Sequence, residues 1–150
     1  MRLKLALVAG ETSGDIHGAD WLLRNLEPNK HGLPVWTHHF DWEYRFTLRA
    51  PWDSGLAQGC ALSCLARAAQ LTGDQRYVTA LREGFRAFLV DMRQGGLCDY
   101  EANGDVWIEE TIVEPPSHIL NGFLWAIWGL WDYWLFTGDA QGKELFDRCV

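Results

Sequence analysis

The chain has 150 residues, of which 48% are hydrophobic and 22% charged, so it is large enough for one globular domain and too apolar for a disordered chain. Its net charge is −7 and its isoelectric point is about 5.1. Because phosphate binding needs clustered basic side chains and the 13 lysines and arginines form no block, we expect no nucleic-acid partner.

Membrane and secretion signals are weak. No apolar run reaches the roughly 18 residues that a spanning helix needs, so we expect no membrane span. The apolar run at residues 3–10 is short and no clear cleavage site follows it, so it makes a poor signal peptide. By default we therefore expect a cytoplasmic protein.

The cysteines and histidines suggest neither a metal site nor a cofactor. The four cysteines form no zinc pattern and no disulfide framework, and Cys60 and Cys64, four residues apart, are expected to be small buried hydrophobic side chains. His38 and His39 lie near Asp41 and Glu43, but neighbours on a strand face opposite sides, so we expect no metal there.

The first third of the chain predicts little regular structure. Residues 3–10 read as an opening strand, and a helix is predicted over residues 16–26, stopped before Pro28. Residues 35–48 are aromatic with partial alternation, which favours extended chain or a hairpin.

From residue 54 onward the pattern is helical. Helices are predicted over residues 55–71 and 75–92, and a third from Ser117 or His118 to residue 136, followed by a fourth over residues 140–150. Between them, the turn Asn103-Gly104 separates two short apolar runs and indicates a hairpin.

The helical part contains an internal repeat. The turn Thr72-Gly73-Asp74 recurs as Thr137-Gly138-Asp139 at an offset of 65 residues, which also superposes Leu65 on Leu130. Each unit is a long apolar helix, a tight turn and a more polar helix, and such hairpins stack into solenoids or close into α/α toroids. Because at least three units are usually needed, we expect an incomplete toroid that self-associates.

Nine tryptophans stand out in the composition. Those on predicted helical faces are expected in the core, since indole buries much apolar area. Trp36, Trp42, Trp52 and Trp107 lie outside the predicted helices and are the candidates for stacking on a sugar ring.

Two blocks of sequence resemble the C-terminal domain of D-glucuronyl C5-epimerases. The first is Pro51-Trp52-Asp53-Ser54-Gly55-Leu56-Ala57-Gln58-Gly59. The second comprises Trp107-Ile108-Glu109-Glu110, Pro116-Ser117-His118-Ile119-Leu120-Asn121-Gly122-Phe123 and Trp128-Gly129-Leu130-Trp131-Asp132. The resemblance runs from about residue 19 to 139, and residues 19–150 are expected to be a partial epimerase-type domain. It implies a mainly α fold built as an incomplete α/α toroid, here with a short β-hairpin and an N-terminal extended segment.

The resemblance implies conversion of glucuronate to iduronate within a heparan-type polysaccharide. The proton at C5 lies α to a carboxylate, so its removal needs a base on one face of the ring and an acid on the other, with donors or cations to offset the growing charge. Glu110 stands at the family's glutamate, and Glu109 beside it is the second catalytic candidate. Thr111 stands where the family has tyrosine, so the alternative is an inactive or truncated carbohydrate-binding or structural remnant.

The substrate-binding candidates share a position in or near the two blocks: Trp52, Gln58, Arg67, Trp107, His118 and Asn121. Arg67 suits a uronate carboxylate or an ion pair. Asn121 is expected to be buried and, like Gln58, to hold a sugar hydroxyl or to bind backbone groups. Glu110 itself is alternatively a loop carboxylate in an ion pair.

The first residues carry a different resemblance. Residues 5–19 are similar to the amino terminus of lipid-A-disaccharide synthases, where a strand runs into a glycine-rich loop and a helix N-terminus aimed at phosphate. No further strand–helix alternation follows here. We therefore interpret residues 1–18 as an atypical leader, from a fusion or a mis-started segment, and glycosyl transfer as a second alternative function.

Overall fold

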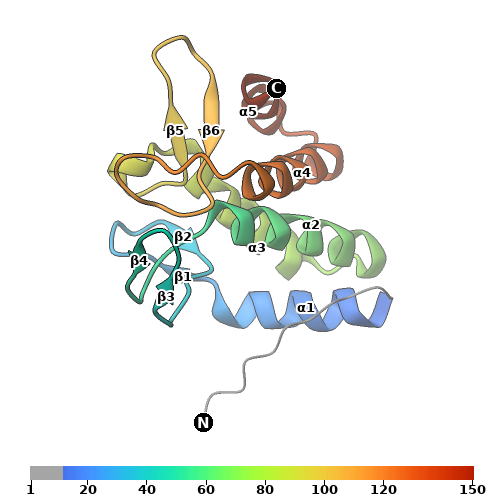
Figure 1. The fold of residues 1–150 in the computed structure, drawn as a ribbon. Helices are drawn as coiled ribbons and strands as arrows, with labels where there is room; N and C mark the ends of the chain where they lie inside the picture. The colour runs from blue at the N-terminus through green and yellow to red at the C-terminus, as the bar shows by residue number, and fades with distance from the viewer. Residues whose placement is uncertain (1–11) are drawn as a thin grey trace.

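The computed structural model describes residues 12–150, which form five α-helices and three two-stranded antiparallel sheets (Figure 1). The helices are α1 (Thr12–Asn25), α2 (Gly55–Thr72), α3 (Gln75–Phe85), α4 (Leu120–Thr137) and α5 (Ala140–Cys149). The mainly helical prediction is confirmed. The strand predicted at residues 3–10 lies outside the described residues, whereas the last part of the predicted leader belongs to α1.

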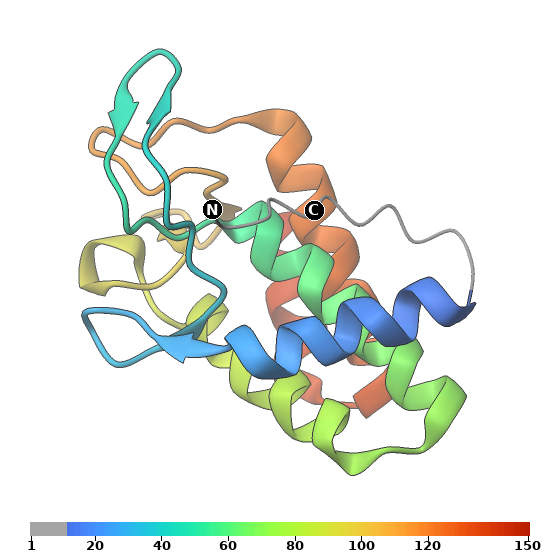
Figure 2. The same ribbon diagram turned by 90° about the horizontal axis from the view of Figure 1, so that it is seen from below.

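The sheets are small and come from the loops between the helices. They pair β1 (Glu27–Pro28) with β2 (Pro34–Val35), β3 (Trp42–Glu43) with β4 (Thr47–Leu48), and β5 (Cys98–Tyr100) with β6 (Val106–Ile108). Gly104 adopts φ 98° at the turn between β5 and β6, so the hairpin predicted from Asn103-Gly104 is confirmed. Seen from below, β3 and β4 project at one end of the helices, beside the loop that leads into α4 (Figure 2).

Helix α2 is the centre of the helical layer, with α1 on one side, α4 on the other and α3 behind it (Figure 1). The core gathers where these helices meet and includes Leu62, Leu65 and Leu130, none of which is exposed. No helix among residues 12–150 is both long and apolar enough to cross a bilayer.

The predicted repeat is present as two helical hairpins, α2–α3 and α4–α5. Gly73 and Gly138 end the first helix of each hairpin with almost equal φ values of 69° and 68°. Asp74 and Asp139 then cap the second helix, each by accepting a hydrogen bond from the backbone N–H two residues on. The same turn chemistry is therefore used twice.

Three predicted helix boundaries are wrong. The helix predicted from residue 16 begins at Thr12. The helix predicted over residues 75–92 ends at Phe85 and continues as the short 3-10 helices η1 (Arg86–Leu89) and η2 (Met92–Gln94), because Val90 is extended and Asp91 caps η2. Helix α4 begins at Leu120 rather than at Ser117 or His118. His118 has φ 45°, which a right-handed helix excludes.

The expectation that helical tryptophans are core residues is wrong for four tryptophans on α1 and α4. Trp21, Trp125, Trp128 and Trp131 are 37–54% exposed. Helix α4 is apolar around much of its circumference, and only one side of it packs on α2. Conversely, Trp36 is predicted from the sequence as a candidate for sugar stacking, but the structure buries it. Its indole N–H donates to the carbonyl of Leu22.

The expected burial of Cys60 is also wrong, because this side chain lies on the exposed face of α2, and Cys64 is only partly buried. All four cysteines are free thiols.

Glycines allow α2 and α4 to approach closely. A Cβ added at Gly59 would lie 2.5 Å from the Cα of Ala126, and one added at Gly129 would overlap the backbone oxygen of Gly59. Each glycine thus faces the backbone of the opposite helix, so a side chain could be accommodated there only if the helices moved apart.

We expect Gly129→Ala to lower the free energy of unfolding by about 1–3 kcal/mol, the usual cost of overpacking a core, as measured by urea denaturation. Gly18→Ala is the matched control, because the added Cβ would meet only the Cys64 sulfur at 3.2 Å. Both changes gain the same helix propensity. Equal stability of the two variants would contradict the close contact.

Candidate functional site

The second of the two sequence blocks lies at the end of β6, in the loop that leads to α4 and in α4 itself. Here the backbone of Glu109 is held from two sides. Its N–H donates to the carbonyl of Leu97, and its carbonyl accepts a 2.9 Å hydrogen bond from the N–H of Gly55, the first residue of α2. A Cβ at Gly55 would lie 2.5 Å from that carbonyl oxygen, so the contact requires glycine.

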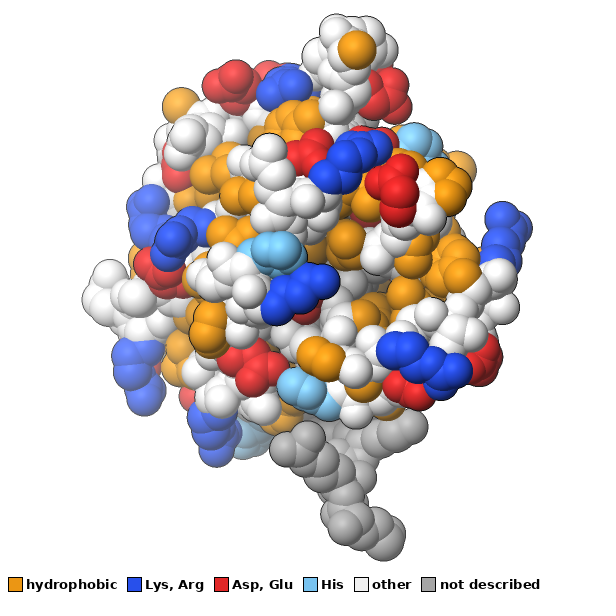
Figure 3. Space-filling model, turned by 90° about the vertical axis from the view of Figure 1, so that its left-hand side faces the viewer, with side chains coloured by type: hydrophobic (Ala, Val, Ile, Leu, Met, Phe, Trp, Pro, Cys, Tyr) orange, Lys and Arg blue, Asp and Glu red, His pale blue; other side chains and the backbone are white. Residues whose placement is uncertain are grey.

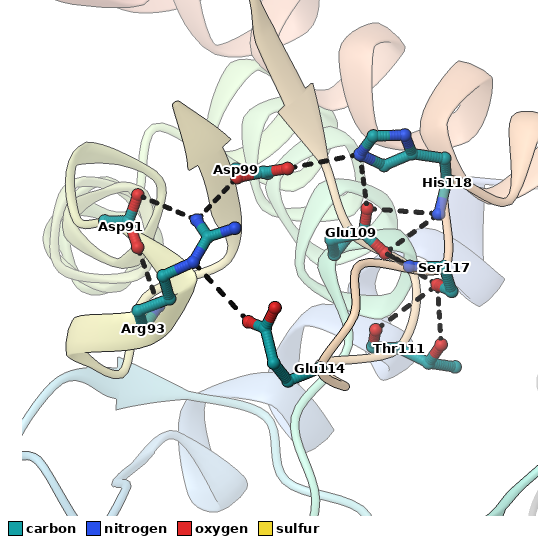
Figure 4. A network of polar contacts seen from close by, with 8 residues as sticks. All are labelled: Asp91, Arg93, Asp99, Glu109, Thr111, Glu114, Ser117 and His118. Atoms are coloured by element: carbon teal, nitrogen blue, oxygen red, sulfur yellow. Dashed lines mark hydrogen bonds and ion pairs between the residues drawn. The ribbon is translucent and has the colours of Figure 1, made fainter. Parts of the chain in front are cut away.

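The Glu109 carboxylate is fully buried and organises the loop (Figure 4). It accepts hydrogen bonds from the Ser117 hydroxyl at 2.6 Å and from the backbone N–H groups of Ser117 and His118 at 3.0 and 3.1 Å. Ser117 and His118 are thereby held in the loop before helix α4, and His118 adopts the non-helical φ of 45°. In this conformation Glu109 therefore stabilises the loop, because its carboxylate oxygens accept hydrogen bonds from loop residues.

A chain of charges extends from Glu109 (Figure 4). Nε2 of His118 lies 3.4 Å from Glu109 and 3.2 Å from Asp99, and Asp99 in turn accepts a 2.6 Å hydrogen bond from Arg93. Hydrogen bonding to Arg93, followed by that to His118, lowers the pKa of Asp99. The network joins the β5–β6 hairpin to the loop before α4 through charge-assisted hydrogen bonds.

The surroundings of the Glu110 carboxylate differ from those of Glu109. Its Oε2 is buried without a hydrogen-bond partner, and the side chain packs so closely on α4 that a Cβ at Gly122 would overlap it. Burial raises the pKa of this carboxyl. Within residues 12–150 no cation lies within ion-pair distance of it, so the ion-pair alternative finds no support.

Thr111 is fully buried, and its hydroxyl lies 3.0 Å from that of Ser117. The side chain at the position of the family's tyrosine therefore points into the loop packing.

A cleft of about 670 Å³ lies next to this loop and is bordered by Ile112 and Val113. Trp52 is one of its walls, stacked on Trp42 and with its indole N–H donating to the carbonyl of Phe40. The basic side chains that line the cleft are Lys30, His31, His39, Arg49 and Arg93, against two acidic ones, Glu27 and Asp53.

The lining thus carries more basic than acidic side chains, but Arg49 is already paired with Asp41 at 2.6 Å and Arg93 with Asp99 at 2.6 Å. Basic, histidine and acidic side chains are interspersed among hydrophobic ones over this face of the molecule (Figure 3).

The remaining predicted site residues do not gather in one place. Trp107 lies near the loop, stacked on Phe123 at 4.2 Å and beside His118. Gln58 is in the core, where its amide donates to the carbonyls of Pro34 and Gly84. Arg67 lies on the face formed by α2 and α4.

Asn121 is exposed in the first turn of α4, so the prediction that it is buried is wrong. The helix starts at Leu120, which turns this position to solvent.

Several residues of the site were missed in the sequence. Arg93 and Asp99 extend the polar network, and Lys30 and His31 line the cleft. Nothing in their local pattern marks them, since they are brought together only by the fold. Among residues 12–150 no group of three or more His, Cys, Asp or Glu side chains is arranged to hold a metal.

The repeated helical hairpins and the glutamate-bearing loop beside a basic cleft define a helical-hairpin repeat domain with a carboxylate site. The family model described as the C-terminus of D-glucuronyl C5-epimerase matches residues 29–150. The chain belongs to this family.

Two relatives illustrate the family. A D-glucuronyl C5-epimerase of Caenorhabditis elegans is 33% identical over 114 residues, which are 76% of this chain and 18% of that protein. An uncharacterized protein of Methanocaldococcus jannaschii is 31% identical over 115 residues, which are 75% of this chain and 37% of that protein. The chain therefore spans well under half of the length of either relative.

We expect Glu109→Gln to destabilise the protein by about 1–3 kcal/mol, because the amide has one acceptor oxygen where several N–H and O–H donors now meet a carboxylate. Thermal unfolding measures the change. Glu114→Gln, on the exposed part of the same loop, is the control and should differ little from the wild type. A Glu109 variant as stable as this control would show that the network does not hold the loop.

We expect Glu110→Gln to have the opposite effect at neutral pH. Because the pKa of Glu110 is raised in the folded state, stability falls as the pH rises from the ordinary value of about 4.3 through the raised one. The variant lacks this loss, so its urea midpoint at pH 7 should exceed that of the wild type, and the difference should vanish below about pH 4. If Glu110→Gln is less stable than wild type at pH 7, the charge has a stabilising partner.

Proposed function

We propose that the chain is a carbohydrate-active domain of the glucuronyl C5-epimerase type, which binds a uronate-containing polysaccharide in the basic cleft and removes the C5 proton with Glu110. The observation that carries the proposal is the Glu110 carboxylate, which is desolvated and has no hydrogen bond at Oε2. We further propose that the two hairpins, within residues 19–150, are units of an α/α toroid.

A raised pKa suits Glu110 to proton abstraction. Desolvation raises the pKa of Glu110 and so brings it closer to the working pH. In the reaction the C5–H bond breaks, the proton passes to Glu110 and the electron pair moves onto the substrate carboxylate as an enediolate. Return of a proton to the opposite face of C5 gives iduronate.

The cleft supports the choice of an anionic polymer. In this proposal Lys30 offsets the charge that builds on the substrate carboxylate, while Arg49 and Arg93 are already paired with Asp41 and Asp99. Trp52 offers an aromatic wall for a pyranose ring. Ile112 and Val113, two and three residues after Glu110, line the cleft, and the proposal requires the bound substrate to reach from there to the Glu110 carboxylate beside Gly122.

One observation favours a second function, binding without catalysis. Thr111 stands where the family has tyrosine, and it is buried with its hydroxyl bonded to Ser117. A side chain in this position does not reach a substrate, so the proton donor has to come from elsewhere for the reaction to be completed.

We expect the wild-type chain to exchange deuterium from heavy water into C5 of heparosan, a glucuronate polymer, and Glu110→Gln to lower the rate by at least about 100-fold. Mass spectrometry of the recovered polymer measures the exchange. Glu144→Gln, on α5 and exposed, is the control for the loss of one carboxylate. Unchanged exchange in Glu110→Gln would remove it as the base, and heparosan binding without exchange by the wild type would select the binding function.

A further inference from the structure

A second pocket lies on the exposed face of α2 and α4. Its volume is about 340 Å³, within the usual range for small-ligand sites. The face carries Trp125, Trp128 and Trp131 from α4, and opposite them Ser63 and Arg67 from α2. It shares no lining residue with the basic cleft.

The three tryptophans present aromatic surfaces to the pocket. Trp125 and Trp128 are 51% and 54% exposed, and their rings meet edge to face at 4.9 Å. The negative face of an indole attracts the C–H groups on the apolar side of a pyranose ring. Such surfaces at one wall suit a flat, partly apolar ligand.

The polar groups at the end of the pocket have a balanced charge. The guanidinium of Arg67 lies 3.4 Å from Asp15 and 3.8 Å from Asp132, beyond good hydrogen-bond length. Two carboxylates therefore already surround the one cation, and a third, from a uronate, would be repelled. The hydroxyls of an uncharged sugar meet no such repulsion, since Asp132 accepts from them and Arg67 and Ser63 donate to them.

We propose that this pocket binds an uncharged pyranose ring, stacked on Trp128 and hydrogen-bonded by Arg67 and Asp132. The site does not depend on the role of Glu110.

Calorimetric titration of the whole chain with cellotriose and with triacetylchitotriose, both uncharged, tests the site. The wild type binds at least one of them, and Trp128→Ala weakens that binding about tenfold or more, the loss expected for one stacked aromatic contact. Trp21→Ala is the matched control, because Trp21 is 48% exposed on α1 and does not line the pocket. This control and Glu110→Gln both keep wild-type affinity.

A second variant tests the effect of charge in this pocket. Asp132→Asn removes one of the two carboxylates around Arg67, so affinity for a glucuronate oligosaccharide rises relative to that for the uncharged trisaccharide.

Three results would overturn the proposal: no binding of either trisaccharide, equal loss in Trp128→Ala and Trp21→Ala, or wild-type preference for the glucuronate oligosaccharide in this pocket. A dimer that Trp128→Ala alone dissociates, without sugar binding by the wild type, would assign the face to a second copy of the chain.

Discussion

The close contact of α2 with α4 sets the position of everything else in the molecule. Gly59 and Gly129 let the two backbones meet without side chains between them, and the core of leucines fills the rest of the interface. With α4 in that place, Gly122 lies against Glu110, and the tryptophans of α4 lie across from Arg67. Both candidate sites therefore depend on the same helix crossing.

Two neighbouring glutamates show how the fold divides one residue type between two roles. Glu109 points inward, where hydrogen bonds from Ser117 and His118 satisfy its charge. Glu110 points to the opposite side of the chain after β6, where its Oε2 is shielded from water and has no hydrogen-bond partner. The first carboxylate stabilises the loop, and the second is held in an unfavourable environment that suits proton transfer. The alternation of side chains at the end of an extended strand separates the two.

Much of the architecture could be predicted from local pattern. Short stretches of sequence specify the two Thr-Gly-Asp turns, the helices that they join and the Asn103-Gly104 hairpin. The errors came where distant groups compete for a backbone or a face. Helix α4 starts late because His118, in the loop that the Glu109 carboxylate holds, has a φ of 45°, and apolar periodicity could not show which side of α4 stays uncovered.

The sequence alone determined the family, the repeated hairpin and the position of Glu110, because motifs and turn chemistry are properties of contiguous residues. Only the tertiary structure decided that Glu109 is satisfied while Glu110 is not, and that Arg67 faces the tryptophans rather than the basic cleft. Desolvation and charge pairing depend on which segments, far apart in the chain, pack together, and no single stretch of sequence carries that information.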